Sequence, residues 1–502
     1  MLPGPMSGRL RAAAVAAALL ASASPSAAQT PTTGEGALGP AQTAALDAIA
    51  ETIVARKASP SIVIGVAKAG RMVYLKALGY RNLDDRVPAD ADTLYGIGSN
   101  TKQFTAACIL LLRDDRKLDV DAQVARYLPH LPHGKEVTIR QLLTHTGGYA
   151  EFTELDDIDR LAARPATSDE ILATIAGRPL GFRPGTKWQY SNTGYVILTA
   201  VIEKLSGMPY ADFLRRRIFE PLGMTRTRYE DQGLVETDRA AGYTRFAMGD
   251  QEHEEHLDYS WLSGAGAIAS TAGDLERWNE AIDRGALLSP ESRTMMHTPM
   301  HLADGTDTHY GFGLFLQSLP GNRHLVLHGG DTTGFGTQDA RFIEERLDII
   351  VLTNQEPAAY NAIVNAVYAV VGSGEAAASV GPPAPAPADD AVAPAIPYAK
   401  ASVDALARRW LDDVVAGTID LTKLRPSFAA DVRLPRARTA LRNLALYGPR
   451  RYTLVSVDRR SPTSTYAYLL QTQKRTLLYV FAVDDDGLIA GADVSDPNPL
   501  AP

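Results

Sequence analysis

The stretch Tyr95-Gly96-Ile97-Gly98-Ser99-Asn100-Thr101-Lys102-Gln103-Phe104-Thr105 sets a serine and a lysine three residues apart, where a glycine-rich turn opens an apolar helix. Because one helical turn separates them, the Ser99 hydroxyl and the Lys102 amine share a face and come within hydrogen-bond reach. Unpaired backbone N–H groups at the helix start favour a negative oxygen forming beside Ser99. The pattern predicts a nucleophilic serine, but chance also produces it, so partners must be sought elsewhere.

Two later stretches carry side chains that could complete such a site. Tyr190-Ser191-Asn192 lies between Pro184-Gly185 and a helical pattern. The strand-like run from His324 to Leu327 continues into His328-Gly329-Gly330-Asp331. A tyrosine can carry a proton, and glycines allow a substrate backbone to lie close against a strand. Both stretches therefore fit the chemistry that Ser99 would need.

In this order the three stretches resemble the Ser-x-x-Lys, Tyr-x-Asn and (Lys/His)-x-Gly motifs of the serine β-lactamase and penicillin-binding protein clan. The class C β-lactamase branch is the most similar, because three flanking stretches also match it. These are Leu142–Gly148, Glu220–Met224 and Gly264–Thr271. The resemblance covers about residues 40–372 and implies an acyl-enzyme mechanism.

The resemblance implies a role for each of three side chains. Ser99 would attack the substrate carbonyl carbon, and Tyr190 would protonate the leaving group and then activate water. Lys102, desolvated against the apolar helix, would either take the serine proton as a neutral amine or stay charged and lower the pKa of Tyr190. The sequence leaves these two alternatives open.

The other matching positions would bind the substrate or its developing charge. The substrate-binding residues implied are Asn192, His328, Gly329 and Gly330. Asn192 would also hold Lys102 in place, and the oxyanion hole would be the backbone N–H groups of Ser99 and Asp331. No metal ion and no cofactor are expected.

His328 departs from the pattern of efficient class C β-lactamases, which carry a lysine at this position. A lysine is a cation that can hold a substrate carboxylate, whereas histidine is mostly neutral at pH 7. His-x-Gly is familiar in the clan's D-aminopeptidases, some D-alanyl-D-alanine carboxypeptidases and esterase-like members. The sequence therefore predicts a serine hydrolase that cleaves an ester, an amide or a D-amino-acid peptide bond, with at most weak activity on β-lactams. The alternative is a penicillin-binding sensor that is acylated without turnover.

The predicted fold is α/β in the α+β sense: a β-lactamase-like antiparallel sheet flanked by helices, with an inserted helical subdomain. The pattern predicts a strand hairpin around Gly70 and a helix in front of it. The expected strands are 61–67, 72–77, 324–327, 338–343 and 347–352, and the expected helices are 41–56, 103–113, 168–176, 195–205, 272–282 and 359–371.

The ends of the chain carry separate signals. Residues 1–28 combine Arg9 and Arg11 with an apolar run and small residues before Gln29, which is typical of a secretory signal peptide and predicts export to the periplasm or the medium. Residues 373–397 are rich in proline and alanine and predict a linker. Residues 398–502 predict a small α+β domain with helices at 403–414 and 438–446, followed by four strands at 452–457, 465–470, 476–483 and 488–494.

Several other features have ordinary interpretations. The formal net charge of -8, without a basic stripe, argues against nucleic acid as a partner, and a small-molecule or peptide substrate is expected. No membrane span is expected once the signal peptide is removed, and the oligomeric state stays open. The single cysteine, Cys108, is predicted to be buried core. His145 is predicted to be a hydrogen-bonded turn histidine, and His253-Glu254-Glu255-His256 a solvated loop.

Overall fold

The computed structural model describes residues 37–155, 158–230, 238–245, 250–254, 258–356, 358–373, 400–433, 451–460, 463–472, 476–496 and 498–500. The predicted signal peptide, nearly all of the predicted linker and the predicted helix at 438–446 lie outside these residues. No helix among the described residues is long and apolar enough to cross a membrane.

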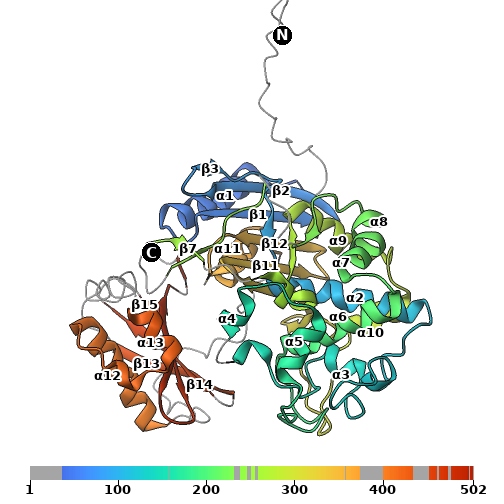
Figure 1. Cartoon of the computed structure of the whole chain (residues 1–502). Coiled ribbons are helices and arrows are strands. Elements are labelled where there is room, and N and C mark those ends of the chain that lie inside the picture. Colours follow the sequence, from blue (N-terminus) through green and yellow to red (C-terminus); the bar gives the residue numbers. More distant parts are fainter. Residues whose placement is uncertain are drawn as a thin grey trace, which may run out of the picture. The chain divides into compact units, whose positions relative to one another are not determined.

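The main element of the fold is a seven-stranded antiparallel sheet in the order β3-β2-β1-β12-β11-β10-β9 (Figure 1). Its strands are β1 Ser61–Lys68, β2 Arg71–Asn82, β3 Val87–Pro88, β9 Phe315–Leu319, β10 Arg323–Thr332, β11 Phe335–Phe342 and β12 Leu347–Thr353. The N-terminal hairpin pairs directly with the returning strand β12, so the two ends of this region build one sheet and the helical segments are inserted between them.

Alternating side chains direct the two faces of the sheet toward different helices. In β1, Ile62 and Ile64 pack in a cluster with α1 (Pro40–Ala55) and α11 (Tyr360–Val371). Val63, between them, packs on the opposite face. The second face is covered by α9 (Ala272–Arg284), whose Ala272 lies close to Gly65. Both faces are therefore covered by helices, which confirms the predicted antiparallel sheet flanked by helices.

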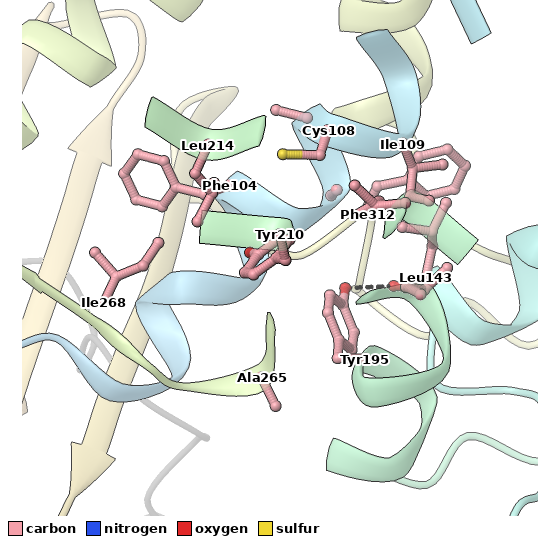
Figure 2. Close-up of a cluster of buried hydrophobic side chains, with 14 of the residues drawn as sticks. Phe104, Cys108, Ile109, Leu143, Tyr195, Tyr210, Leu214, Ala265, Ile268 and Phe312 are labelled. Carbon is pink, nitrogen blue, oxygen red and sulfur yellow. Dashed lines mark hydrogen bonds between the residues drawn. The ribbon is translucent and has the colours of Figure 1, made fainter. Parts of the chain in front are cut away.

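The helix α2 (Thr101–Asp114) runs through the centre of the larger hydrophobic core, and every residue from Thr101 to Leu112 is buried. Figure 2 shows Phe104 and Cys108 on this helix among side chains from several other segments. Cys108 is fully buried, which confirms its prediction as a core residue. The helix α2 packs against α6 Asn192–Ser206, α7 Tyr210–Leu214 and α10 Pro290–Met296. The other helices of the inserted region are α3 Ile139–Leu143, α4 Ile158–Ala162, α5 Ser168–Ile175 and α8 Glu220–Leu222.

Two small sheets complete this part of the fold. One has the order β4-β8-β5 and comprises β4 Tyr95–Gly96, β8 Ile268–Ser270 and β5 Arg228–Tyr229; the other pairs β6 Tyr243–Thr244 with β7 Glu252–His253. The first sheet fixes the residues just before Ser99, because Tyr95 and Gly96 pair with β8. It was not predicted, since runs of two or three residues carry no detectable alternation.

The C-terminal residues have a sheet and a hydrophobic core of their own. The sheet order is β13-β14-β15-β16, with bounds Arg451–Arg460, Thr463–Gln471, Thr476–Asp484 and Ile489–Ser495, and the helices are α12 Ala401–Ala416 and α13 Pro426–Arg433. Trp410 of α12 packs against Phe428 of α13 and Phe481 of β15. This arrangement confirms the predicted small α+β fold, with α13 as an unpredicted helix.

Candidate active site

Ser99 lies in a short 3-10 turn, Gly98–Asn100, that leads directly into α2. Gly98 has a φ of +50°, and a Cβ at this position would come within 2.9 Å of the Asp331 backbone. Only glycine fits this combination of left-handed backbone and close approach. The turn therefore brings Ser99, which is partly exposed, against the strand β10.

Lys102 sits one turn further along α2 and is fully buried. Its amine donates hydrogen bonds to Ser99 Oγ at 3.0 Å, Asn192 Oδ1 at 2.8 Å and the Ala265 carbonyl oxygen at 2.8 Å. Two of these partners can only accept, whereas the serine hydroxyl can also donate. A neutral amine would keep its bonds to Asn192 and Ala265 and direct its lone pair at the hydroxyl of Ser99.

The electrostatic surroundings of Lys102 favour loss of its proton. Burial disfavours the charged form and lowers the pKa of Lys102 to about 7, although the negative charge of Glu151 opposes this shift. A substantial fraction of the amine is therefore neutral at neutral pH. This fits the first of the two alternatives that the sequence left open.

Tyr190 lies in the irregular segment just before α6, and its side chain forms a hydrogen bond with that of Ser99. Its ring is 4.7 Å from the Lys102 amine. Burial raises the pKa of Tyr190 well above 10, so the free protein holds it as a protonated phenol. Ser99, Lys102 and Tyr190 thus meet as the sequence predicted, and a protonated Tyr190 can serve as a proton donor.

Asn192 is the first residue of α6, one turn earlier than the predicted start of this helix. Ser191 caps the helix by accepting a hydrogen bond from the Gly194 N–H. This cap sets Asn192 in place, with its side chain toward Lys102. The position of Asn192 agrees with the role that the resemblance implied.

Glu151 belongs to the same site and was missed by sequence reasoning. Its Oε2 accepts hydrogen bonds from the backbone N–H groups of Asn192 at 2.7 Å and Thr193 at 3.3 Å. A carboxylate at a helix N-terminus is stabilised by the helix dipole. Glu151 supplies negative charge near Lys102, yet its burial raises its own pKa. A lone glutamate after a Gly-Gly turn carries no sequence signal that would have revealed this position.

On the other side of Ser99, β10 carries the third motif. A Cβ at Gly330 would lie 1.9 Å from the Ile97 carbonyl oxygen, so the backbones of β10 and of the Ser99 turn touch here. Gly329 is also closely packed, against Gln338 and Tyr360. The glycine pair thus lets the strand approach the nucleophile, and the N–H groups of Ser99 and Asp331 belong to the two segments in contact. The Asp331 side chain accepts a hydrogen bond from Tyr360 at 2.7 Å.

His328 is buried beside the site, with its ring centroid 6.3 Å from that of Tyr190. Its Nε2 lies 3.1 Å from the Tyr310 hydroxyl, and its Nδ1 lies 2.6 Å from the Gly329 carbonyl oxygen. Burial, reinforced by the charge of Lys102, lowers the pKa of His328 to about 3. The histidine is therefore neutral and provides no cation for a substrate carboxylate.

Two other histidine positions had predictions: His145 follows its prediction, whereas His253 lies at the end of the strand β7 and not in the predicted loop. His145 lies in a turn, and its Nδ1 accepts a hydrogen bond from the Ser191 N–H, which confirms the predicted turn histidine. Its ring also packs on Tyr190, which the sequence did not reveal. His253 is exposed and pairs with Asp84, while residues 255 and 256 lie outside the described part of the chain.

Comparison with known proteins places this site in a family. The family described as Beta-lactamase matches residues 46–372. The chain therefore belongs to the β-lactamase family, within the superfamily of serine β-lactamases and penicillin-binding proteins, and is a serine hydrolase of the acyl-enzyme type.

The curated relatives of this chain include penicillin-binding proteins and D-aminopeptidases. The chain is 33% identical over 303 residues to "Penicillin-binding protein 4*" of Bacillus subtilis, covering 58% of this chain and 67% of that protein. It is 27% identical over 331 residues to a D-aminopeptidase of Gluconobacter oxydans, covering 66% and 62%. The chain thus spans about two thirds of the length of these curated relatives.

Solved structures agree with this fold. A D-amino acid amidase from Ochrobactrum anthropi is 28% identical, with a TM-score of 0.58, and the match covers 66% of this chain and 98% of the amidase. An octameric penicillin-binding protein homologue from Pyrococcus abyssi is 22% identical, with a TM-score of 0.58, and its match covers 89% of this chain and 98% of the homologue. At 22% identity, the similarity to the Pyrococcus abyssi homologue concerns the fold alone.

Proposed function

We propose that the protein is a class C-like serine hydrolase that cleaves D-amino-acid amide, peptide or ester bonds through an acyl-enzyme on Ser99. The observation that carries this proposal is the buried Lys102 amine, 3.0 Å from the Ser99 hydroxyl and held by two acceptor-only partners. An amine with a pKa of about 7 can accept the serine proton at neutral pH.

Acylation follows from this geometry. Ser99 Oγ passes its proton to neutral Lys102 and forms a bond to the substrate carbonyl carbon. The N–H groups of Ser99 and Asp331 stabilise the oxyanion of the tetrahedral intermediate. Tyr190 gives its phenolic proton to the leaving amine or alcohol as the carbonyl carbon–leaving group bond breaks, and Lys102 returns a proton to Tyr190.

Deacylation uses the same groups, with the proton transfers reversed. A water molecule loses a proton to the Tyr190–Lys102 pair and attacks the acyl carbon, and the released Ser99 oxygen recovers a proton. Asn192 keeps Lys102 oriented through both steps, because its Oδ1 is 2.8 Å from the amine. The complete set of Ser99, Lys102 and Tyr190 favours turnover over a sensor that only becomes acylated.

The substrate preference rests on the neutral His328. Because position 328 carries a neutral histidine in place of a lysine, the carboxylate of a penicillin meets no cation there, and we expect weak β-lactamase activity at most. Similarity to proteins named D-aminopeptidase and D-amino acid amidase supports D-amino-acid derivatives as the substrate class.

The test compares wild type with Ser99→Ala on a D-amino-acid p-nitroanilide, an activated ester and a fluorescent penicillin. We expect Ser99-dependent release from the first two and only weak, short-lived penicillin labelling. Ser206→Ala, at the end of α6, is a matched control that should retain activity. Stable penicillin label without release would support the sensor instead, and equal turnover by Ser99→Ala would refute the assignment.

We also propose that the chain is exported. The support is the order of charged, apolar and small residues in 1–28. Expression in a Gram-negative host followed by N-terminal sequencing of the mature protein tests this proposal, with Gln29 as the expected first residue. Retention of the full N-terminus in the cytoplasm would contradict it.

A further inference from the structure

His145 holds an unusual backbone position next to the segment that carries Tyr190. It follows α3 in a tight turn and has a φ of +59°, in the left-handed region, where non-glycine residues are uncommon although histidine is among those enriched there. The side chain is buried, with an exposed fraction of 1%. A buried histidine with a left-handed backbone beside a proposed proton donor calls for a physical reason.

Two hydrogen bonds fasten His145 to both neighbours of Tyr190. The Gln189 N–H donates to the His145 carbonyl oxygen at 2.9 Å. The Ser191 N–H donates to His145 Nδ1 at 3.1 Å. Between these bonds the imidazole packs on the phenol ring of Tyr190, with centroids 4.3 Å apart and an interplanar angle of 35°. One residue therefore fixes the backbone on each side of Tyr190 and one face of its ring.

The bond from Ser191 also determines where the imidazole proton lies. Because Nδ1 accepts, the proton of the neutral ring is on Nε2. Nε2 is buried and has no hydrogen-bond partner among the described residues. Protonation of Nδ1 would remove the acceptor and release Ser191, so the clamp requires a neutral ring.

The groups that face the ring keep it neutral. It packs against the rings of Trp188, Tyr190, Tyr195 and Tyr310. Burial, followed by the charge of Lys102, lowers the pKa of His145 well below 6.5. The ring therefore keeps its Nδ1 acceptor at the pH values where Lys102 is active.

We propose that His145 is a positioning residue that aligns Tyr190 with Ser99 by clamping residues 189–191, and that it carries no proton itself. This inference rests on the proposed function, in which Tyr190 donates the proton to the leaving group. A displacement of about 1 Å in a reacting group can cost about 100-fold in rate. The clamp therefore acts on kcat and leaves substrate binding largely unchanged.

The test compares His145→Gly with His145→Asn on the D-amino-acid p-nitroanilide. Both substitutions tolerate a positive φ, but only asparagine places an acceptor oxygen near the position of Nδ1. We expect His145→Gly to lose about 100-fold in kcat with KM within about threefold, and His145→Asn to recover at least about tenfold of that loss. The limbs of the pH–rate profile should stay in place in His145→Asn, since the proton carriers are Lys102 and Tyr190.

Wild-type kcat in His145→Gly, or equal kcat in both variants, would overturn the clamp. Loss of a limb from the pH profile in His145→Asn would overturn the claim that His145 carries no proton. Ser99→Ala separates this inference from the proposed function. If Ser99→Ala turns over the substrate as fast as wild type, the proposed function is wrong; if only the two His145 variants behave unexpectedly, the clamp alone is wrong.

A spectroscopic measurement needs no active variant. Histidine-selective ¹⁵N labelling of the wild-type protein, with the His145 signals assigned by their absence in His145→Asn or His145→Gly, reports the tautomer directly. We expect the neutral Nε2–H tautomer between pH 6 and pH 8. An imidazolium or an Nδ1–H tautomer in this range would overturn the proposal even if neither variant could be assayed.

Discussion

The two sides of Ser99 differ in how much charge they hold. The lysine side, formed by Lys102, Asn192 and Glu151, contains a buried amine with three polar partners and a nearby carboxylate. The strand side, formed by His328 to Asp331, presents backbone N–H groups, a neutral imidazole and the Asp331 carboxylate, which accepts a hydrogen bond from Tyr360. The apparatus that would activate a nucleophile is therefore in place, whereas residues 328–331 offer no cation to anchor a substrate carboxylate.

The same burial produces both outcomes. Transfer out of water disfavours the charged form of any base, so it brings the pKa of Lys102 to about 7 and that of His328 to about 3. Lysine starts high enough to remain a useful base after this shift, but histidine does not. The positive charge of Lys102 further opposes protonation of His328, so the two sides are coupled.

The largest expected effect comes from removing the base on the lysine side. Lys102→Met keeps the length of the side chain but abolishes proton acceptance, so kcat/KM for the D-amino-acid p-nitroanilide should fall by about 10³-fold or more. Stopped-flow acylation and steady-state release measure the loss. Lys204→Met, near the end of α6, is the control and should leave kcat/KM within about twofold of wild type, since surface substitutions rarely matter. Near-normal turnover by Lys102→Met would show that Lys102 is not the base that activates Ser99.

On the strand side, the close approach of β10 can be broken with one methyl group. In Gly330→Ala the Cβ would collide with the Ile97 carbonyl oxygen, so the strand must move away from Ser99. We expect about a 100-fold loss of kcat, because the oxyanion donors separate. Gly177→Ala is the matched control, since a Cβ there meets nothing within 4 Å. Equal activities of the two variants would show that the strand does not form part of the site.

The motif order allowed the main site to be predicted because its chemistry depends on residue types. Ser99, Lys102 and Tyr190 come together across α2 and the start of α6, and His328 lies on the predicted strand, now β10. Much of the sheet could also be predicted from the sequence, since its strands carry long apolar runs such as Ile62 to Ala67.

Other parts of the site could not be read from the sequence. Glu151 and His145 act through backbone N–H groups of residues that lie far along the chain, and such contacts leave no local pattern. The strand β9 was missed because its Phe315–Leu319 segment is short and interrupted by Gln317 and Ser318. Contacts made by the main chain are therefore the part of the site that only the folded structure reveals.

A smaller effect tests the missing cation directly. His328→Lys introduces the residue of efficient β-lactamases, and we expect acylation by a penicillin to increase by about tenfold, since a charge-assisted bond contributes about 1.5 kcal/mol or more. The gain is limited because Lys102 repels a second buried cation. Cleavage of the D-amino-acid p-nitroanilide, which has no carboxylate, should not improve. A parallel gain on both substrates, measured by kcat/KM, would show that the neutral His328 does not determine substrate preference.

The smallest expected effect concerns the carboxylate on the lysine side. In wild type, kcat/KM should rise with pH through about 7, because Lys102 must lose its proton to act as the base. Glu151 stabilises the charged amine, so Glu151→Gln should lower the pKa of Lys102 and move this acidic limb to lower pH. The amide oxygen can still accept from the Asn192 N–H, which preserves the start of α6.

Glu203→Gln is the matched control for this last prediction. Glu203 is also a partly buried carboxylate that accepts a backbone hydrogen bond, from the Tyr210 N–H at 3.1 Å, but it does not shift the pKa of Lys102. Its variant should keep the wild-type limb. If Glu151→Gln moves the limb to higher pH, or both variants move it alike, Glu151 does not set the charge of Lys102. In that case burial would set the pKa of the amine without an opposing contribution from Glu151, and the lysine side would differ from the strand side only in which base it carries.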